Sequence, residues 1–112
     1  MDYIVRLKKN LHFKNVYKRG QSIADKYIVI YYVKNNLDVT RVGFTASKKV
    51  GNSVKRNRAR RLMKESFRKL SYSYCKNGYD IVVIARVAIK DATLKDVEKS
   101  MERAMKKIKY KN

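Results

Sequence analysis

Residues 41–68 read RVGFTASKKVGNSVKRNRARRLMKESFR, and this stretch contains three successive patterns. In residues 40–47, apolar side chains alternate with others, which predicts a strand or a bent pair of strands. Residues 47–53 (SKKVGNS) are mostly small or polar, as in a loop. From about Ser53 to Leu70, apolar residues recur at intervals of three and four, which predicts a helix. The stretch therefore leads from a strand, through a short loop, into a helix.

The predicted helix has two chemically different sides. At about 100° per residue, its apolar side consists of Ala59, Leu62, Met63, Ser66, Phe67 and Leu70. Most of the opposite side consists of Arg56, Asn57, Arg60, Arg61, Lys64 and Arg68, with Arg58 near the margin. Nine cations and no acidic residue lie between Val39 and Lys64. An ordinary solvated face is the alternative, but such faces usually mix charges because like charges at i and i+4 destabilise a helix.

The basic residues are placed where they should weaken an isolated helix. Lys55, Arg56 and Arg58 lie near its N-terminus, where the macrodipole is positive. Each cation there should cost about a few tenths of a kcal/mol. A bound phosphate reverses the sign, because the free N–H groups, the dipole and the guanidinium forks all attract it. The pattern therefore predicts a surface that binds phosphate groups.

The rest of the sequence supplies elements around this stretch. We expect a helix capped by Asn10 and stopped at Gly20, strands at 26–33 and 80–87, a turn at 35–38, and a helix from Thr93 to about Tyr110. Thr93 and Asp96 resemble a capping box. The order predicts an α+β fold, an α/β sandwich of order α-β-β-β-α-β-α with helices packed on a small mixed sheet. We expect a single domain spanning residues 1–112.

The composition favours an anionic partner. The 29 Lys and Arg against 9 Asp and Glu give a net charge of +20, which favours nucleic acid. Cys75 is the only cysteine, so no internal disulfide can form, as in proteins of reducing compartments. The longest apolar run, residues 27–33, is too short to span a bilayer, and the N-terminus shows no signal-peptide pattern. We expect a cytoplasmic protein without a membrane partner.

The sequence shows no constellation for protein-borne catalysis. His12 is the only histidine, Cys75 is the only thiol, and CxxC or HExxH spacing is absent. Most of the acidic residues flank strands or belong to the last helix, and no pair is placed for acid–base work or metal-assisted hydrolysis. We expect no catalytic residue, no metal ligand and no cofactor bound by the protein alone. The chain is therefore expected to bind its partner without reacting with it.

Aromatic residues suggest a second surface. Phe13 and Tyr17 are four apart on one face of the first predicted helix, and Tyr27 and Tyr31 share one face of the first predicted strand. Aromatic rings on a sheet face beside a basic helix can stack on single-stranded bases. For any one of these side chains, a place in the core is the favoured interpretation. The sequence leaves both interpretations open for Phe13 and Tyr17.

The motifs of the chain resemble those of one protein family. Four short motifs of this chain resemble the signature of the bacterial ribonuclease P protein subunit. They are Ser47-Lys48-Lys49, Gly51-Asn52, Arg56-Asn57-Arg58 and Arg60-Arg61. The opening RLKKNLHFKNVYKRGQS (6–22) and DIVVIAR (80–86) also resemble that family, so the resemblance covers nearly the whole chain. Ser53 and Ala59 depart from it, because alanine and a larger aliphatic residue are usual there. Both departures lie on or near the packing side and bear on local stability rather than on binding.

The resemblance implies a role in a ribonucleoprotein. The protein would join a catalytic RNA that removes the 5′ leader from precursor tRNA, and this RNA would perform the hydrolysis with bound Mg²⁺. The residues implied to contact the catalytic RNA are Lys48, Lys49, Asn52, Lys55, Arg56, Asn57, Arg58, Arg60, Arg61 and Lys64. The residues implied to hold the single-stranded leader, in a cleft between the first helix and the sheet, are Phe13, Tyr17, Tyr31 and Thr45.

The resemblance also implies a topology, and rival functions differ from it in what they predict. Parallel strands would be joined through the basic helix by a left-handed crossover, against the usual preference, and no protein partner would be obligatory. A ribosomal or other structural RNA-binding protein is the alternative and would share the charge. A protein nuclease would instead cleave precursor tRNA without added RNA. A DNA-binding protein would prefer duplex DNA, for which no helix-turn-helix pattern is visible.

Overall fold

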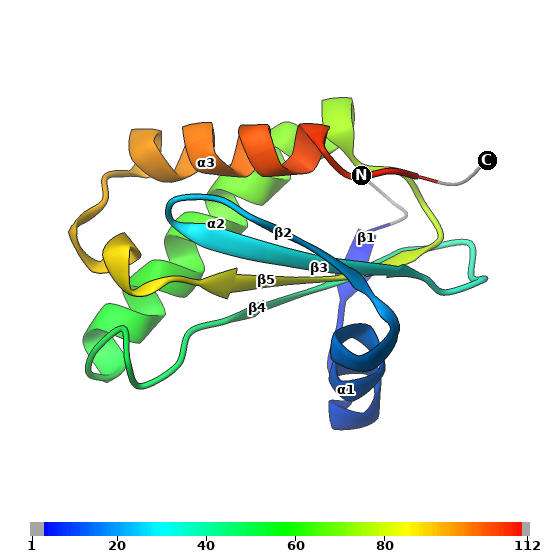
Figure 1. The fold of residues 1–112 in the computed structure, drawn as a ribbon, viewed down its shortest axis with the longest axis horizontal. Coiled ribbons are helices and arrows are strands. Elements are labelled where there is room, and N and C mark those ends of the chain that lie inside the picture. The colour runs from blue at the N-terminus through cyan, green and yellow to red at the C-terminus, as the bar shows by residue number, and fades with distance from the viewer. Residues whose placement is uncertain (1–3, 111–112) are drawn as a thin grey trace.

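A five-stranded mixed sheet organises the chain in this computed structural model, which describes residues 4–110 (Figure 1). The strands are β1 (Ile4–Arg6), β2 (Gln21–Ala24), β3 (Ile28–Lys34), β4 (Thr40–Thr45) and β5 (Tyr79–Ala85). The helices are α1 (Asn10–Arg19), α2 (Ser53–Tyr74) and α3 (Leu94–Lys106), with a 3₁₀ turn, η1, at Val87–Asp91. The predicted α+β class and the α-β-β-β-α-β-α order are confirmed, with β1 added in front.

The spatial order of the strands differs from their order along the chain. The sheet runs β1-β4-β5-β3-β2. β4 is parallel to both β1 and β5, whereas β3 is antiparallel to β5 and to β2. The helix α2 therefore lies in the connection between two neighbouring parallel strands, as the crossover unit requires.

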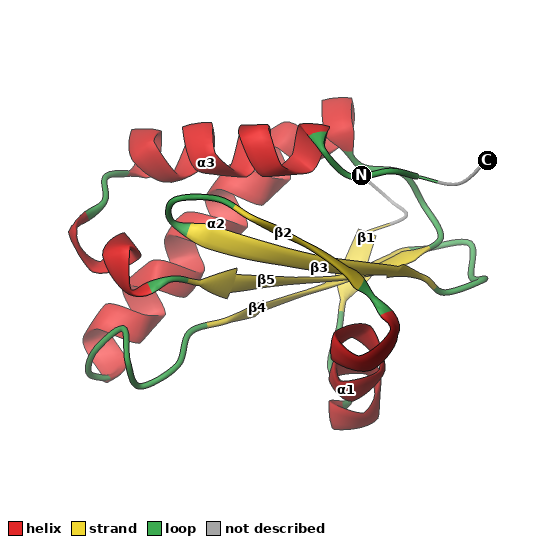
Figure 2. Ribbon diagram, in the orientation of Figure 1, coloured by secondary structure: helices red, strands yellow, loops and turns green. Residues whose placement is uncertain are grey.

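Helices cover both faces of the sheet (Figure 2). α2 and α3 pack on one face, where Ile30, Ile81 and Val83 belong to the main core together with Met63 and Met101. α1 packs on the other face, against β3 and β5. There a smaller cluster forms from Leu7, Val16 and Val82. The central strand β5 is thus covered on both faces, as its nearly continuous apolar sequence predicts.

The helices agree with the sequence patterns in their packing and differ at some ends. The wheel of α2 is confirmed, because Ala59, Leu62, Met63, Ser66 and Phe67 are all buried. α2 continues to Tyr74 rather than ending at Leu70, and α3 ends at Lys106 rather than about Tyr110. The reciprocal capping box of Thr93 and Asp96 is present.

The sequence interpretation was wrong at the N-cap of α1, and it missed the positions of two short strands. Lys9, not Asn10, is the N-cap of α1, and its side chain makes no capping hydrogen bond. Gly20 does end the helix, where its N–H donates to the Val16 carbonyl at 2.8 Å. A Cβ at Gly20 would lie 2.4 Å from that oxygen, so a larger residue cannot be placed there without movement. Of the two alternatives for residues 40–47, the single strand is present, over Thr40–Thr45, and the bent pair is not. The short strands β1 and β2 were not expected.

Candidate nucleic-acid interface

The loop before α2 is fixed by three residues that are not cations. Val50 is buried and anchors the loop to the core. Gly51 has a φ of +144°, a conformation that favours glycine, and a Cβ there would lie 2.6 Å from Cδ of Lys55. Asn52, predicted to contact RNA, is the N-cap of α2, and its Oδ1 accepts from the Lys55 N–H at 3.0 Å. The loop is thereby turned so that Lys48 and Lys49 are exposed.

The arginines of α2 are not equivalent. Arg56 folds back over the loop and donates to the Gly51 carbonyl at 3.3 Å and to Ser53 Oγ at 3.2 Å. Arg58 Nη2 donates to the carbonyl of Ala92, at the approach to α3, at 2.7 Å. Both cations therefore make hydrogen bonds within the protein. Arg56 and Arg58 were expected to destabilise the free helix through its dipole. Their hydrogen bonds within the protein offset part of that cost.

The remaining cations of the basic side are directed outward. Lys55, Arg61 and Lys64 are exposed, and Arg60 is half-buried with its guanidinium donating to Asn57 Oδ1. The first turn of α2 contains no acidic residue. Because the first-turn N–H groups and the dipole add to these charges, an anion along this side is stabilised by all three. The structure therefore brings the predicted basic residues onto one helix and its preceding loop.

Part of the predicted aromatic surface lies together on the α1 face of the sheet. The rings of Tyr17 and Tyr31 meet edge to face with centroids 5.4 Å apart. Partial burial raises the pKa of Tyr17, and the hydrogen bond between its hydroxyl and Thr45 partly opposes that rise. Tyr17 remains 41% exposed. Since Tyr31, Thr45 and Ile84 are half-buried, this part of the sheet presents rings and hydroxyls that can contact a base.

Phe13 lies in a different environment from Tyr17. It is half-buried and packs against the small cluster around Leu7, Val16 and Val82. Its ring also lies over Gly43, where a Cβ would be 2.5 Å from Cζ. Gly43 therefore lets the ring approach the sheet backbone. Phe13 therefore packs within the protein, although its half-buried ring also borders a groove, whereas Tyr17 is the more exposed of the two.

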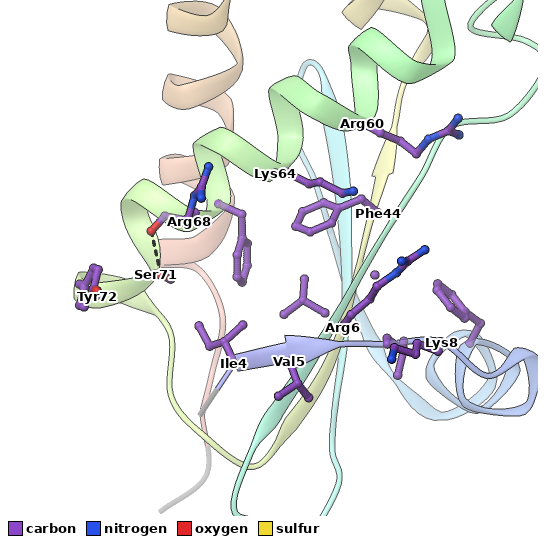
Figure 3. A pocket seen from close by; sticks show the side chains of 15 residues that line it. Ile4, Val5, Arg6, Lys8, Phe44, Arg60, Lys64, Arg68, Ser71 and Tyr72 are labelled. Atoms are coloured by element: carbon purple, nitrogen blue, oxygen red, sulfur yellow. Dashed lines mark hydrogen bonds between the residues drawn. The ribbon is translucent and has the colours of Figure 1, made fainter. Parts of the chain in front are cut away.

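A groove that the sequence did not reveal runs between β1 and α2 (Figure 3). It has a volume of about 1000 Å³. Cations on its walls are Arg6, Lys8, Arg60, Lys64 and Arg68. The aromatic residues Phe13, Phe44, Phe67 and Tyr72 line it as well. Arg6 and Lys8 were missed because β1 was not predicted, although RLKK at residues 6–9 already marked a basic segment.

A polar network joins α1 to the middle of the sheet. Arg41 forms a bidentate ion pair with Asp80 on neighbouring β5, with Nε–Oδ1 and Nη2–Oδ2 distances of 2.8 and 2.6 Å. The hydrogen bond to Asp80 raises the pKa of Arg41. Asn35 donates to the same carboxylate at 2.9 Å, and Arg41 Nη1 lies 3.0 Å from His12 Nδ1. Asp80 is only 2% exposed, so its pair with Arg41 is a structural contact. His12, the single histidine, belongs to the same network because it contacts Arg41.

The described part of the chain has neither a cluster of metal-ligand side chains nor a helix suited to a bilayer. No group of three or more His, Cys, Asp or Glu side chains within residues 4–110 is placed to hold a metal ion. Among the helices described, none has the length and apolar character required to cross a bilayer.

Comparisons with known proteins agree with this geometry. The family model described as Ribonuclease P matches residues 1–109. The ribonuclease P protein component of Clostridioides difficile is 54% identical over 101 residues, covering 90% of this chain and 89% of the relative. The Staphylococcus aureus RNase P protein structure at 2.0 Å has a TM-score of 0.79 at 39% identity and covers 93% of each chain.

A second S. aureus structure is described as an RNase P protein mutant with defective mRNA degradation activity. It has a TM-score of 0.80 at 40% identity, over 94% of this chain and 86% of that one. The family model matches nearly the whole chain, and the relatives are similar over about nine-tenths of it. The chain therefore belongs to the ribonuclease P protein family.

Proposed function

We propose that this chain, a ribonuclease P protein component, holds the catalytic RNA on the basic side of α2 and the single-stranded 5′ leader of precursor tRNA on the α1 face of the sheet. It thereby assists endonucleolytic 5′ maturation of tRNA. The observation that carries the proposal is the outward row of cations on α2, which follows a capped helix start and a glycine turn. Helix N-terminus and guanidinium groups together favour phosphate.

The leader is assigned to the face that carries Tyr17, Tyr31 and Thr45. Single-stranded RNA is usually recognised by aromatic rings that stack on unpaired bases. Tyr17 and Tyr31 form an edge-to-face pair at the margin of α1, and Tyr17 is exposed. The sheet separates this face from α2, so leader and catalytic RNA need not compete for one surface.

The protein is proposed to contribute binding, while the RNA, with Mg²⁺, performs the cleavage. His12 is held by Arg41, and Cys75 is buried with its pKa raised to about 11, chiefly by burial. Neither is therefore suited to act as a base or nucleophile. The activity named for the S. aureus relative makes a protein-only control on mRNA informative, because degradation there would require a protein-borne site.

Reconstitution tests the proposal directly. The purified protein, a bacterial ribonuclease P RNA, or both are incubated with precursor tRNA at low Mg²⁺. We expect cleavage at the leader junction only with both components, and none from the protein alone on either precursor tRNA or mRNA. Cleavage by the rigorously purified protein would contradict the division of labour. Sedimentation with ribosomal subunits, without stimulation of the RNA, would favour a ribosomal RNA-binding role.

A further inference from the structure

The groove between β1 and α2 has walls of different origin. One wall is α2, which contributes Arg60, Lys64 and Arg68, and the other is β1 with the residues that follow it. Figure 3 shows the cationic side chains of α2 on one side and Arg6 and Lys8 on the other. Among its lining residues within the described chain, five are cations and none is acidic. A long polyanion lying only along α2 would not require cations on the opposite wall.

The interior of the groove is aromatic and apolar. Phe44 and Phe67 meet edge to face with centroids 5.8 Å apart, and Phe67 is 3% exposed. Phe44 is half-buried, so part of its ring borders the groove. Tyr72 stands at the rim with 73% of its surface exposed. Cations around an aromatic floor match a nucleotide, since the base stacks while its phosphates meet the rim.

The groove also borders backbone at the margin of the sheet. β1 pairs with Thr40–Val42, so the edge of β4 that faces away from β5 borders the groove, rather than a strand, in its second half. The carbonyl of Val42 accepts from the Leu7 N–H at 3.0 Å, on the β1 side. Backbone polar groups alternate in direction along a strand, so Phe44, two residues on, turns its N–H and C=O toward the same side. Those groups can meet the edge of a base beside the ring.

We infer that this groove binds one unpaired nucleotide of the catalytic RNA, with the base against Phe44 and the phosphates between Lys64 and Arg6. A base within a duplex is stacked on both faces and cannot reach the aromatic floor. The catalytic RNA is the source favoured here because the α2 wall is the helix proposed to hold that RNA, and the inference rests on this proposed function. Tyr17, Tyr31 and Thr45, which are assigned to the leader, do not line the groove.

Site-directed cross-linking tests the position. A photoreactive phenylalanine analogue replaces Val5, which is 43% exposed and lines the groove, or Val54, which is 76% exposed at the start of α2 and outside it. Each variant is bound to the catalytic RNA with and without precursor tRNA, and cross-links are mapped by primer extension. We expect the Val5 probe to mark an unpaired nucleotide of the catalytic RNA, different from any marked from Val54.

Removal of the base tests the contact. The marked nucleotide is replaced by an abasic one, and affinity is measured for the wild type and Phe44→Leu, which keeps an apolar side chain. The abasic RNA should bind the wild type about ten-fold more weakly, as for the loss of one stacked base. Phe44→Leu should weaken binding of intact RNA but not of abasic RNA. If Phe44→Leu weakens binding of the abasic RNA by the same factor as it weakens binding of the intact RNA, the base does not lie against Phe44.

A matched pair of charge variants distinguishes a specific contact in the groove from the general attraction of RNA to a cationic protein. Lys64→Gln should reduce the Val5 cross-link, whereas Lys69→Gln should not. Lys69 lies on the same helix but contacts Glu98 of α3 at 3.3 Å, outside the groove. Cross-links from Val5 only to paired nucleotides, only to the leader, or to none while Val54 still cross-links would overturn this inference alone. Failure of the wild type to bind the catalytic RNA would overturn the proposed function with it.

Discussion

At the scale of single residues, Asp25 shows how one carboxylate fastens the β2–β3 turn to α3. It accepts from Arg103 Nη2 and from Ser100 Oγ, both at 2.7 Å, and from the Lys26 N–H at 2.8 Å. The hydrogen bond from Arg103 is the largest cause that holds the pKa of Asp25 well below its usual range. Because the charged form is favoured in the folded state, ionisation of Asp25 stabilises the fold.

The contribution of Asp25 should depend on pH with a definite sign. Its pKa is depressed by folding, so the stabilisation is fully present above the unfolded value of about 3.9 and is lost as the pH falls toward the lower folded value. Asp25→Asn should lower the free energy of unfolding by about 1–3 kcal/mol at pH 7. Urea unfolding of both proteins at pH 7, 5, 4 and 3 should show this difference shrinking below pH 4. A difference that stayed constant would contradict the assignment.

Cys75 should be inert in the folded protein. Its side chain is 7% exposed, and burial raises the pKa of the thiol to about 11. Since the thiolate is the reactive form, a thiol reagent such as iodoacetamide should modify Cys75 slowly at pH 8 and rapidly in 6–8 M urea, roughly the range used for complete unfolding. Mass spectrometry measures the modified fraction with time. Equal rates in the two conditions would show that the thiol is accessible.

At the scale of elements, the buried faces of the helices were predicted correctly, whereas some helix ends and two short strands were not. The apolar side of α2 follows from a 3.6-residue period that lies entirely within the local sequence. β1 has three residues and β2 has four, too few for an alternation to be recognised. β1 pairs with Thr40–Val42, far along the chain, so local sequence does not specify it. The Arg58–Ala92 contact and the groove beside β1 are non-local for the same reason.

The arginines of α2 should separate into two classes. Arg61 is exposed, so Arg61→Ala should leave the free energy of unfolding unchanged or slightly raise it, because like-charge repulsion is relieved. Arg58→Ala should lower that free energy by about 1 kcal/mol, because the bond to the Ala92 carbonyl is lost. If each arginine neutralises one phosphate, both variants should reduce the slope of log affinity against log salt by about 0.7–0.9.

Salt titrations of affinity for the catalytic RNA and urea unfolding provide these two quantities. Asn57→Ala is the matched control in the same turn, because it removes hydrogen bonds but no charge. The affinity of this variant for the catalytic RNA should fall, while the slope of log affinity against log salt stays unchanged. Full RNA affinity of the arginine variants at every salt concentration would mean that the basic side is only a solvated surface.

The α1 face should discriminate between precursor and mature tRNA. Tyr17→Ala should weaken holoenzyme binding of precursor tRNA by about 1–3 kcal/mol, the range for one stacked base, and affect mature tRNA little because it lacks the leader. Phe13→Ala should instead lower protein stability, because Phe13 packs against the cluster of Leu7, Val16 and Val82. Circular dichroism checks folding of both variants before affinity is compared. Equal losses for the two tRNAs would exclude a leader contact by Tyr17.

At the scale of the whole molecule, repulsion between like charges lowers the stability that burial of the core provides. The net charge is +20, and the resulting self-repulsion destabilises the compact state. The ion pairs within the described residues are few by comparison, and the one between Lys106 and Glu102 is half-exposed. Repulsion between exposed cations is screened over a Debye length of about 10 Å at 0.1 M salt.

Stability should therefore rise with ionic strength. We expect the urea midpoint of the free protein to increase between about 0.05 and 0.5 M NaCl, a range over which screening becomes short-ranged. The same titration on Asp25→Asn, which lacks the Arg103 ion pair, should give a rise at least as large. A midpoint that fell with salt would mean that attractive pairs such as Arg103–Asp25 outweigh the repulsion.

The strand order sets a schedule for synthesis of the chain. β3 and β4 follow each other in sequence but do not touch as neighbours, because β5 lies between them. On the ribosome, both strands therefore leave the exit tunnel with one edge unsatisfied, and the whole of α2 must follow before β5 can insert. Such late, non-local pairing slows folding and leaves edges open in the meantime. The basic helix is thus made before the sheet that supports it is closed, so the most cationic segment of a nascent chain leaves the ribosome before β5 is there to complete the sheet.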